Sequence, residues 1–157
     1  MVSANDSATA LAIDEGGGSL HRFYTLMNEK AQAVGLTGTT YASASGLDDV
    51  HNRSTALDQA RLARIAMQNR AFARIVGTRR FVTRWAAPTY AKVWINHNKM
   101  LSSTPGTYGV KTGWTTRAGG CLIIAQRRSG RSVIAVLLDS KNIWADMRKL
   151  LKAAFAS

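Results

Sequence analysis

The sequence has few cysteines, few prolines and no long apolar run. Its one cysteine, Cys121, cannot close an internal disulfide, and together with three scattered histidines it offers no zinc-binding spacing. We therefore expect no metal centre. No apolar stretch approaches the roughly 20 residues of a membrane-spanning helix, and residues 1–6 turn polar at once instead of leading into a signal peptide. We expect neither an export signal nor a membrane anchor within these residues.

Acidic residues are scarce in the second half of the chain. Residues 61–157 hold two acidic and eighteen basic side chains, whereas residues 1–60 hold seven acidic and three basic ones. The resulting net charge of +12 favours an anionic partner, and nucleic acid, an anionic lipid surface and an acidic cell-wall polymer all fit it. A solvated basic face explains the same charge equally well.

The composition fits one compact domain, because 46% hydrophobic and 19% charged residues supply a core and a polar surface. We expect residues 1–157 to form a single domain, helical over about 1–77, with a sheet and a C-terminal helix over about 78–157. Residue periodicity predicts helices over Ser3–Ile13 (capped by Asn5 or Asp6), from Ser19 to Gly35 and from Ser54 or Thr55, and a closing helix over 143–156. It predicts strands from Thr78 through Trp85 and over 110–115, 121–127 and 132–138, the last two joined by a turn-like segment, Arg128-Ser129-Gly130-Arg131. This order predicts an α+β fold.

Further expectations concern loops and single side chains. Residues 86–109 are expected to be mostly loop, and Cys121 is expected to be an inert core residue. The third helix is expected to turn these apolar residues inward: Leu57, Leu62, Ile65, Ala66 and Met67. The C-terminal helix is expected to bury Met147, Leu150, Leu151 and Phe155.

The tripeptide Lys111-Thr112-Gly113 lies at the start of a predicted strand. A lysine ammonium beside a threonine hydroxyl can hold a carboxylate through charge and a directed hydrogen bond. The adjacent glycine, Gly113, lets a ligand backbone approach the strand. Taken alone, the tripeptide fits an ordinary exposed strand start at least as well.

A second short motif, Ser3-Ala4-Asn5, lies where the first helix begins, and serine and asparagine there are also ordinary helix caps. S-x-N followed much later by K-T-G is the order found in the penicillin-interacting serine enzymes, whose remaining motif, S-x-x-K, carries the nucleophile. The chain resembles the serine-type D-alanyl-D-alanine carboxypeptidases, which are low-molecular-mass penicillin-binding proteins of peptidoglycan metabolism. The resemblance covers nearly the whole chain, through Met27-Asn28-Glu29-Lys30-Ala31, Gly35-Leu36-Thr37, Gly46-Leu47-Asp48, His51 with Ser54-Thr55-Ala56 and Asp58, Asn96 to Leu101, and Lys111 to Thr115 with Ala118-Gly119.

The resemblance implies a role for each matching site residue. Ser3 would relay a proton to or from the leaving group, and Asn5 would orient the substrate's peptide carbonyl. Lys111 and Thr112 would hold the terminal carboxylate of a stem peptide ending in D-Ala-D-Ala. The backbone N–H of Trp114 would form half of the oxyanion hole. The implied reaction is acyl transfer through a serine ester with release of D-alanine, and it needs no cofactor.

One departure from the family pattern affects activity. No serine in the chain is followed by a lysine three residues later, so the S-x-x-K nucleophile, its helix and the N-terminal strands of the β-lactamase-like, penicillin-binding-protein fold are not among these residues. We expect the isolated chain neither to cleave D-Ala-D-Ala nor to be acylated by a β-lactam unless that segment is supplied. The missing part predicts a bare apolar surface, and hence self-association or binding of a complementary N-terminal segment.

Three functions follow from these observations. The chain is either the C-terminal part of a periplasmic or extracytoplasmic carboxypeptidase or a nonenzymatic remnant that still binds stem peptides. A basic nucleic-acid-binding domain is the third, least favoured alternative.

Overall fold

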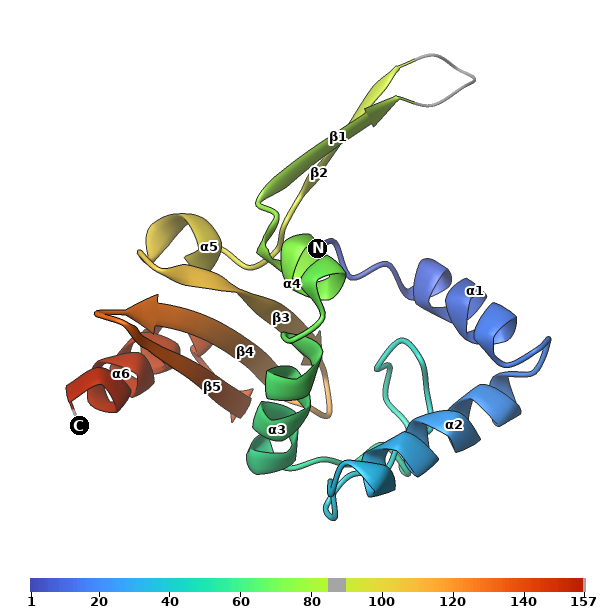
Figure 1. The fold of residues 1–157 in the computed structure, drawn as a ribbon. Helices are drawn as coiled ribbons and strands as arrows, with labels where there is room; N and C mark the ends of the chain where they lie inside the picture. Colours follow the sequence, from blue (N-terminus) through green and yellow to red (C-terminus); the bar gives the residue numbers. More distant parts are fainter. Residues whose placement is uncertain (85–89, 157) are drawn as a thin grey trace.

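The computed structural model describes residues 1–84 and 90–156, and Figure 1 shows their arrangement. The helices are α1 (Asn5–Glu15), α2 (Leu20–Ala33), α3 (Ala56–Ala66), α4 (Arg70–Gly77), α5 (Met100–Ser103) and α6 (Ile143–Ala156). The strands are β1 (Arg80–Arg84), β2 (Ala91–Ile95), β3 (Thr107–Thr115), β4 (Gly119–Arg128) and β5 (Arg131–Ser140). Four helices come first, two antiparallel sheets follow with the short helix α5 between them, and α6 closes the described chain, which confirms the predicted α+β class.

Helices α1 and α2 form an arm that curves away from the sheet in Figure 1. The hydroxyl of Ser19 accepts a hydrogen bond from the Arg22 N–H at 3.3 Å and so begins α2, while Gly35, with a φ of 75°, follows its end. The predicted cap of the first helix is wrong. Ala4 precedes α1 without any side-chain cap, Asn5 is already the first helical residue, and the Asp6 carboxylate accepts a hydrogen bond from the adjacent Ser7 N–H.

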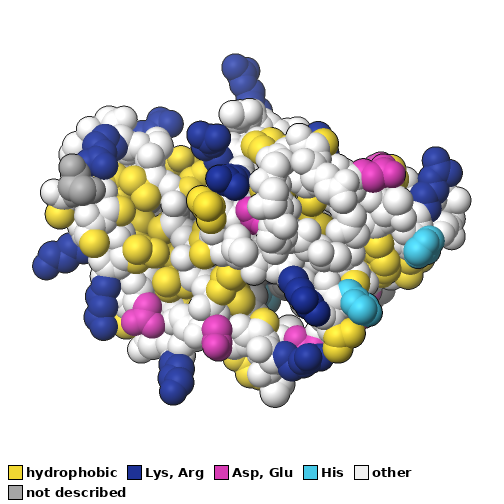
Figure 2. All heavy atoms as spheres, turned by 90° about the horizontal axis from the view of Figure 1, so that it is seen from below, with side chains coloured by type: hydrophobic (Ala, Val, Ile, Leu, Met, Phe, Trp, Pro, Cys, Tyr) yellow, Lys and Arg dark blue, Asp and Glu magenta, His cyan; other side chains and the backbone are white. Residues whose placement is uncertain are grey.

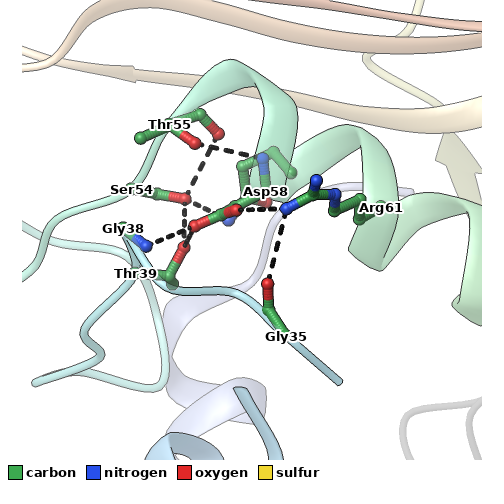
Figure 3. A network of polar contacts seen from close by, with 8 residues as sticks. Gly35, Gly38, Thr39, Ser54, Thr55, Asp58 and Arg61 are labelled. Carbon is green, nitrogen blue, oxygen red and sulfur yellow. Dashed lines mark hydrogen bonds and ion pairs between the residues drawn. The ribbon is translucent and has the colours of Figure 1, made fainter. Parts of the chain in front are cut away.

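Helix α3 is joined to the preceding loop through one buried carboxylate, drawn in Figure 3. Asp58, with 2% of its surface exposed, accepts hydrogen bonds from the Gly38 N–H and the Thr39 hydroxyl, each at 2.8 Å. The predicted cap is confirmed, since the Thr55 hydroxyl accepts a hydrogen bond from the Asp58 N–H at 3.1 Å. This network fixes the residue 38–39 loop against the start of α3.

The predicted inward face of α3 is partly wrong. Leu57 and Ile65 are exposed, whereas Asp58 and Ala63 are the buried residues of this helix. The apolar pattern misled here because the hydrogen bonds of Asp58 compensate the burial of its charge.

The three-stranded sheet, in the order β3-β4-β5, carries the core on both faces. On one face Leu122 and Ile124 pack with Met147 and Leu151 of α6, and on the other Val110 and Ala125 pack with Val76 of α4. The predicted burial of Met147 and Leu151 is confirmed, but Leu150 is 38% exposed. The turn between β4 and β5 is the predicted tight one, with Ser129 and Gly130 at φ values of 50° and 77°.

The expectation of a loop over residues 86–109 is wrong. This range contains β2, α5 and the start of β3, and β2 pairs in antiparallel register with β1. The eight-residue helix α4, capped by the Asn69 side chain on the Phe72 N–H, also precedes the predicted strand. Trp85, expected in that strand, lies outside the described residues.

Apolar surface is exposed on several elements, as expected. Helix α1 buries one residue, Ala12, while Leu11 is 64% and Ile13 is 43% exposed. Figure 2 shows hydrophobic side chains gathered toward the side where the sheet and α6 lie. Leu138 of β5 is 40% exposed. Within the described part of the chain, β5 pairs with β4 along one edge and with no strand along the other. No described helix is long and apolar enough to span a bilayer.

Candidate active-site cleft

A cleft of about 700 Å³ lies between the start of the chain and the edge of β3. It brings together residues that are distant in the sequence. All six predicted site residues line it: Ser3, Asn5, Lys111, Thr112, Gly113 and Trp114. Sequence spacing alone could not predict this meeting, because about a hundred residues separate the two motifs.

The two motifs are in direct contact. The Nζ atom of Lys111 donates a hydrogen bond to the Oγ atom of Ser3 at 2.8 Å, and it also contacts the backbone carbonyl of Thr112. Ser3 has a φ of 55°, in the left-handed region that a residue with a Cβ atom seldom occupies. Residues held in this region are found preferentially where a site requires one side-chain position.

Lys111 gives the cleft its positive charge. Its side chain keeps contact with solvent in the open cleft, yet desolvation by the surrounding walls lowers its pKa from the usual value of lysine. No carboxylate is among the described residues that line the cleft, so the ammonium group has no acidic partner there. An ammonium group without a protein counter-ion suits an anionic ligand.

Strand β3 presents an open edge to the cleft. It pairs with β4 on one side and has no described strand on the other. Gly113 is opposite Cys121 in the register, and its missing side chain leaves the strand accessible. The Trp114 side chain is 73% exposed at the rim. Thr112 and Trp114 can thus face a bound chain at this edge.

Other family-like motifs support the strand rather than contact a ligand. The Asn98 side chain donates to the Gly109 carbonyl at 3.2 Å, and the Asn96 side chain donates to the Val76 and Thr78 carbonyls. At the other end of β3, the hydroxyl of Thr115 donates to the carboxylate of Asp48. The Asn98 contact fixes β3 to the segment that follows β2, and the Thr115 contact fixes it to the residue 46–48 loop.

Sequence reasoning missed several lining residues. Leu47, His97 and Trp144 also line the cleft, although none was predicted to belong to a site. For Leu47 and His97 the only signal was their position within motifs of the family, and Trp144 lies outside every motif of the resemblance. The prediction that Cys121 is a core residue is wrong, because it is half-buried and lines the cleft. Within residues 1–84 and 90–156, no group of three or more histidine, cysteine or acidic side chains could hold a metal ion.

The comparison with known families decides the assignment. Residues 1–142 match the family described as D-alanyl-D-alanine carboxypeptidase. This chain belongs to that family. Among curated relatives of the family, the D-alanyl-D-alanine carboxypeptidase of Streptomyces sp. (strain K15) is 35% identical over 99% of this chain and 58% of its own length. The carboxypeptidase DacF of Bacillus subtilis is 31% identical over 99% of this chain and 40% of its own length.

Solved structures confirm the fold of this D-alanyl-D-alanine carboxypeptidase family. The Streptomyces K15 DD-transpeptidase superimposes with a TM-score of 0.90 at 34% identity, over 97% of this chain and 63% of that one. The D-alanyl-D-alanine carboxypeptidase of Mycobacterium tuberculosis H37Rv gives a TM-score of 0.88 at 29% identity, over 99% of this chain and 60% of that one. The prediction of part of a penicillin-binding-protein fold is confirmed, and the chain spans less than two thirds of each relative.

Proposed function

We propose that this chain is the substrate-binding part of a serine-type D-Ala-D-Ala carboxypeptidase that acts on peptidoglycan stem peptides outside the cytoplasm. The observation that carries the proposal is the 2.8 Å contact between Lys111 Nζ and Ser3 Oγ in a cleft that Asn5 also lines. Family membership supports the same reaction. Members of this family act on the cell wall, on peptides ending in D-Ala-D-Ala.

Lys111 and Thr112 bind the terminal carboxylate of the stem peptide. The ammonium group supplies charge in a cleft without a lining carboxylate, and the Thr112 hydroxyl supplies a directed hydrogen bond. The substrate backbone then lies along the open edge of β3, where Gly113 leaves room for it. This placement brings the scissile carbonyl toward Trp114.

The remaining residues act on the scissile bond. Asn5 orients the substrate's carbonyl, and the backbone N–H of Trp114 is one of the two donors to the developing oxyanion. Loss of one such donor typically costs about 3 kcal/mol of transition-state stabilisation. Ser3 carries a proton to or from the leaving D-alanine amine. Its contact with Lys111, whose pKa is lowered, supports this transfer, because a lysine with a lowered pKa exchanges protons more readily near neutral pH.

The covalent step belongs to a serine that these residues do not supply. In the complete reaction, a serine oxygen attacks the carbonyl carbon, the peptide C–N bond breaks, D-alanine leaves with the added proton, and water then cleaves the ester. Ser3 is not that nucleophile, because no S-x-x-K lysine accompanies it. The isolated 157-residue chain therefore binds the peptide, and it forms no acyl-enzyme with peptide or β-lactam.

The exposed apolar surface supports binding of a complementary N-terminal segment. Beside the cleft, a second cavity of about 470 Å³ lies between the residue 40–54 loop and the end of β5, and Met27 and Leu138 are among its apolar lining residues. Strand β5 has an open edge within the described chain. A segment carrying a strand and the nucleophile helix would pair with the open edge of β5 and fill the second cavity. Self-association through the same surface is the outcome when that segment is absent.

Peptide binding tests the proposal. We expect saturable binding of diacetyl-L-lysyl-D-alanyl-D-alanine by calorimetry, and a loss of at least tenfold in affinity in Lys111→Ala. Lys30→Ala, which removes an exposed lysine of α2 outside the cleft, is the matched control and keeps wild-type affinity. Equal affinity of Lys111→Ala and wild type would refute the site.

Acylation separates an enzyme from a binding remnant. We expect a stoichiometric penicilloyl adduct, detected by intact mass, after an S-x-x-K-bearing N-terminal segment of a relative is added to the chain. Peptide binding without acylation in the reconstituted complex favours the nonenzymatic alternative. An adduct on the isolated chain would contradict the assignment of Ser3 as a proton relay.

A further inference from the structure

The hairpin of β1 and β2 stands apart from the rest of the molecule. Figure 1 shows it projecting away from the sheet and the helices. Its strands form a separate two-stranded antiparallel sheet. Two strands alone are only marginally stable in water. The side chains of such a hairpin therefore indicate what surface it contacts.

Apolar side chains are exposed on both faces of the hairpin. The register places Val82 opposite Val93 on one face and Phe81 opposite Trp94 on the other. The exposed fractions are 53% for Phe81, 42% each for Val82 and Val93, 48% for Tyr90 and 56% for Ile95. Contiguous exposed apolar surface of this kind marks an interaction site.

The charges on the hairpin all have the same sign. Its described residues, 79–84 and 90–95, contain four basic residues and no acidic one: Arg79, Arg80, Arg84 and Lys92. In the register Arg80 is opposite Ile95 and Arg84 is opposite Ala91, so arginines flank the Val82–Val93 pair. On the other face, the Lys92 ammonium lies 5.3 Å from the centre of the Trp94 ring. Apolar and cationic groups are thus interleaved along the hairpin.

We propose that the β1–β2 hairpin binds an anionic lipid surface. The projecting hairpin enters the boundary between headgroups and acyl chains with both of its faces. Val82, Val93 and Ile95 leave water on one face and Trp94 does so on the other, while the arginines reach the lipid phosphates. Aromatic rings such as Tyr90 and Trp94 are favoured at that boundary. An acidic cell-wall polymer would pair with the charges but would leave the apolar side chains in water. The observations therefore favour lipid over polymer.

Vesicle sedimentation of the whole 157-residue chain tests this proposal. We expect binding to vesicles of phosphatidylglycerol and phosphatidylcholine, weak binding to pure phosphatidylcholine, and a partition coefficient reduced about tenfold or more in the double variant Val82→Ser with Ile95→Ser. The matched apolar control is Leu11→Ser with Ile13→Ser on α1. The matched charge control is Arg127→Ser with Arg128→Ser at the end of β4.

Both controls should bind within about twofold of the wild type, because the proposal places neither surface against the bilayer. An equal loss in the α1 control would indicate unspecific apolar adhesion and overturn the proposal. An equal loss in the charge control would indicate attraction by net charge alone and would also overturn it. Unchanged vesicle binding in the hairpin variant would also overturn the proposal. If the wild type self-associates and this variant sediments as a monomer, the hairpin contacts a second copy of the chain instead.

Fluorescence quenching keeps the test valid where the serine variant fails to fold. Brominated lipids quench tryptophan that enters the acyl boundary. We expect brominated lipids to quench Trp94→Phe less than the wild type. Trp114→Phe, which removes an exposed tryptophan of the cleft rim, should be quenched as strongly as the wild type. Equal quenching of Trp94→Phe and the wild type would refute lipid contact by the hairpin. Peptide affinity does not enter this readout, so its result is independent of the proposed function.

Discussion

Removal of the Asp58 carboxylate should destabilise the fold strongly. The side chain is almost fully buried and accepts two hydrogen bonds at 2.8 Å, from the Gly38 N–H and the Thr39 hydroxyl. Hydrogen bonds to a charged group contribute about 1.5–3 kcal/mol each. Arg61 lies 3.6 Å from the other carboxylate oxygen, but its side chain is 46% exposed, so this ion pair adds at most about 1 kcal/mol.

Asp58→Ala should therefore lower the free energy of unfolding by about 3–5 kcal/mol, because the Gly38 N–H and the half-buried Thr39 hydroxyl lose a charged acceptor. Asp58→Asn should cost less, since an amide oxygen can still accept one or both bonds without the charge. Urea unfolding followed by circular dichroism measures both values. Asp14→Asn, at the exposed end of α1, is the matched control and should remain within about 0.5 kcal/mol of the wild type. A loss below about 1 kcal/mol in Asp58→Ala would refute the role of this network.

Four further outcomes follow from the described contacts. Peptide binding should weaken as the pH rises through the pKa of Lys111, which lies below the usual 10.5 of lysine, because only the protonated form carries the binding charge. An affinity that stays constant up to pH 10.5 would contradict this role of Lys111. The same lowered pKa makes the folded state gain stability with rising pH between the two values, because the unfolded chain holds the extra proton there, and Lys111→Met should remove this gain from pH-dependent unfolding curves. Thr55→Ala should cost about 1 kcal/mol in urea unfolding, since the Asp58 N–H loses its cap, whereas Thr55→Ser should not. Gly106→Ala should prevent or severely weaken folding, because Gly106 has a φ of 78° and a Cβ atom there would collide with the Arg127 carbonyl; a wild-type melting curve would disprove that collision.

Periodicity predicted the long elements and failed for the short ones. The C-terminal helix over 143–156 and the tight turn at Ser129-Gly130 follow from local sequence, and both are present. Helix α4 has eight residues, and β2 has five, so neither gave a pattern long enough to separate it from loop. The orientation of α3 was mispredicted, because the hydrogen bonds of Asp58 place this charged side chain, and not Leu57, in the interior.

The cleft could be predicted only through the family resemblance. S-x-N is common and K-T-G alone also fits an ordinary strand start, and no local rule indicates that Lys111 and Ser3 meet at 2.8 Å. The order of the motifs along the chain supplied that information. What the resemblance did not supply were the lining roles of Leu47 and Cys121, because these depend on how the residue 45–47 loop and β4 face the same space.

The two walls of the cleft differ in how firmly the fold holds them. The β3 wall belongs to a sheet with buried cores on both faces, whereas α1, which carries Asn5, buries Ala12 alone and leaves Leu11 in solvent. Local opening is easiest where few apolar contacts must be broken. Amide hydrogens of α1 should therefore exchange with solvent much faster than those of β4. Under the proposed function, Lys111 and Thr112 then stay in place while the side with Ser3 and Asn5 opens. A peptide would therefore be bound by its terminal carboxylate before its scissile bond is positioned.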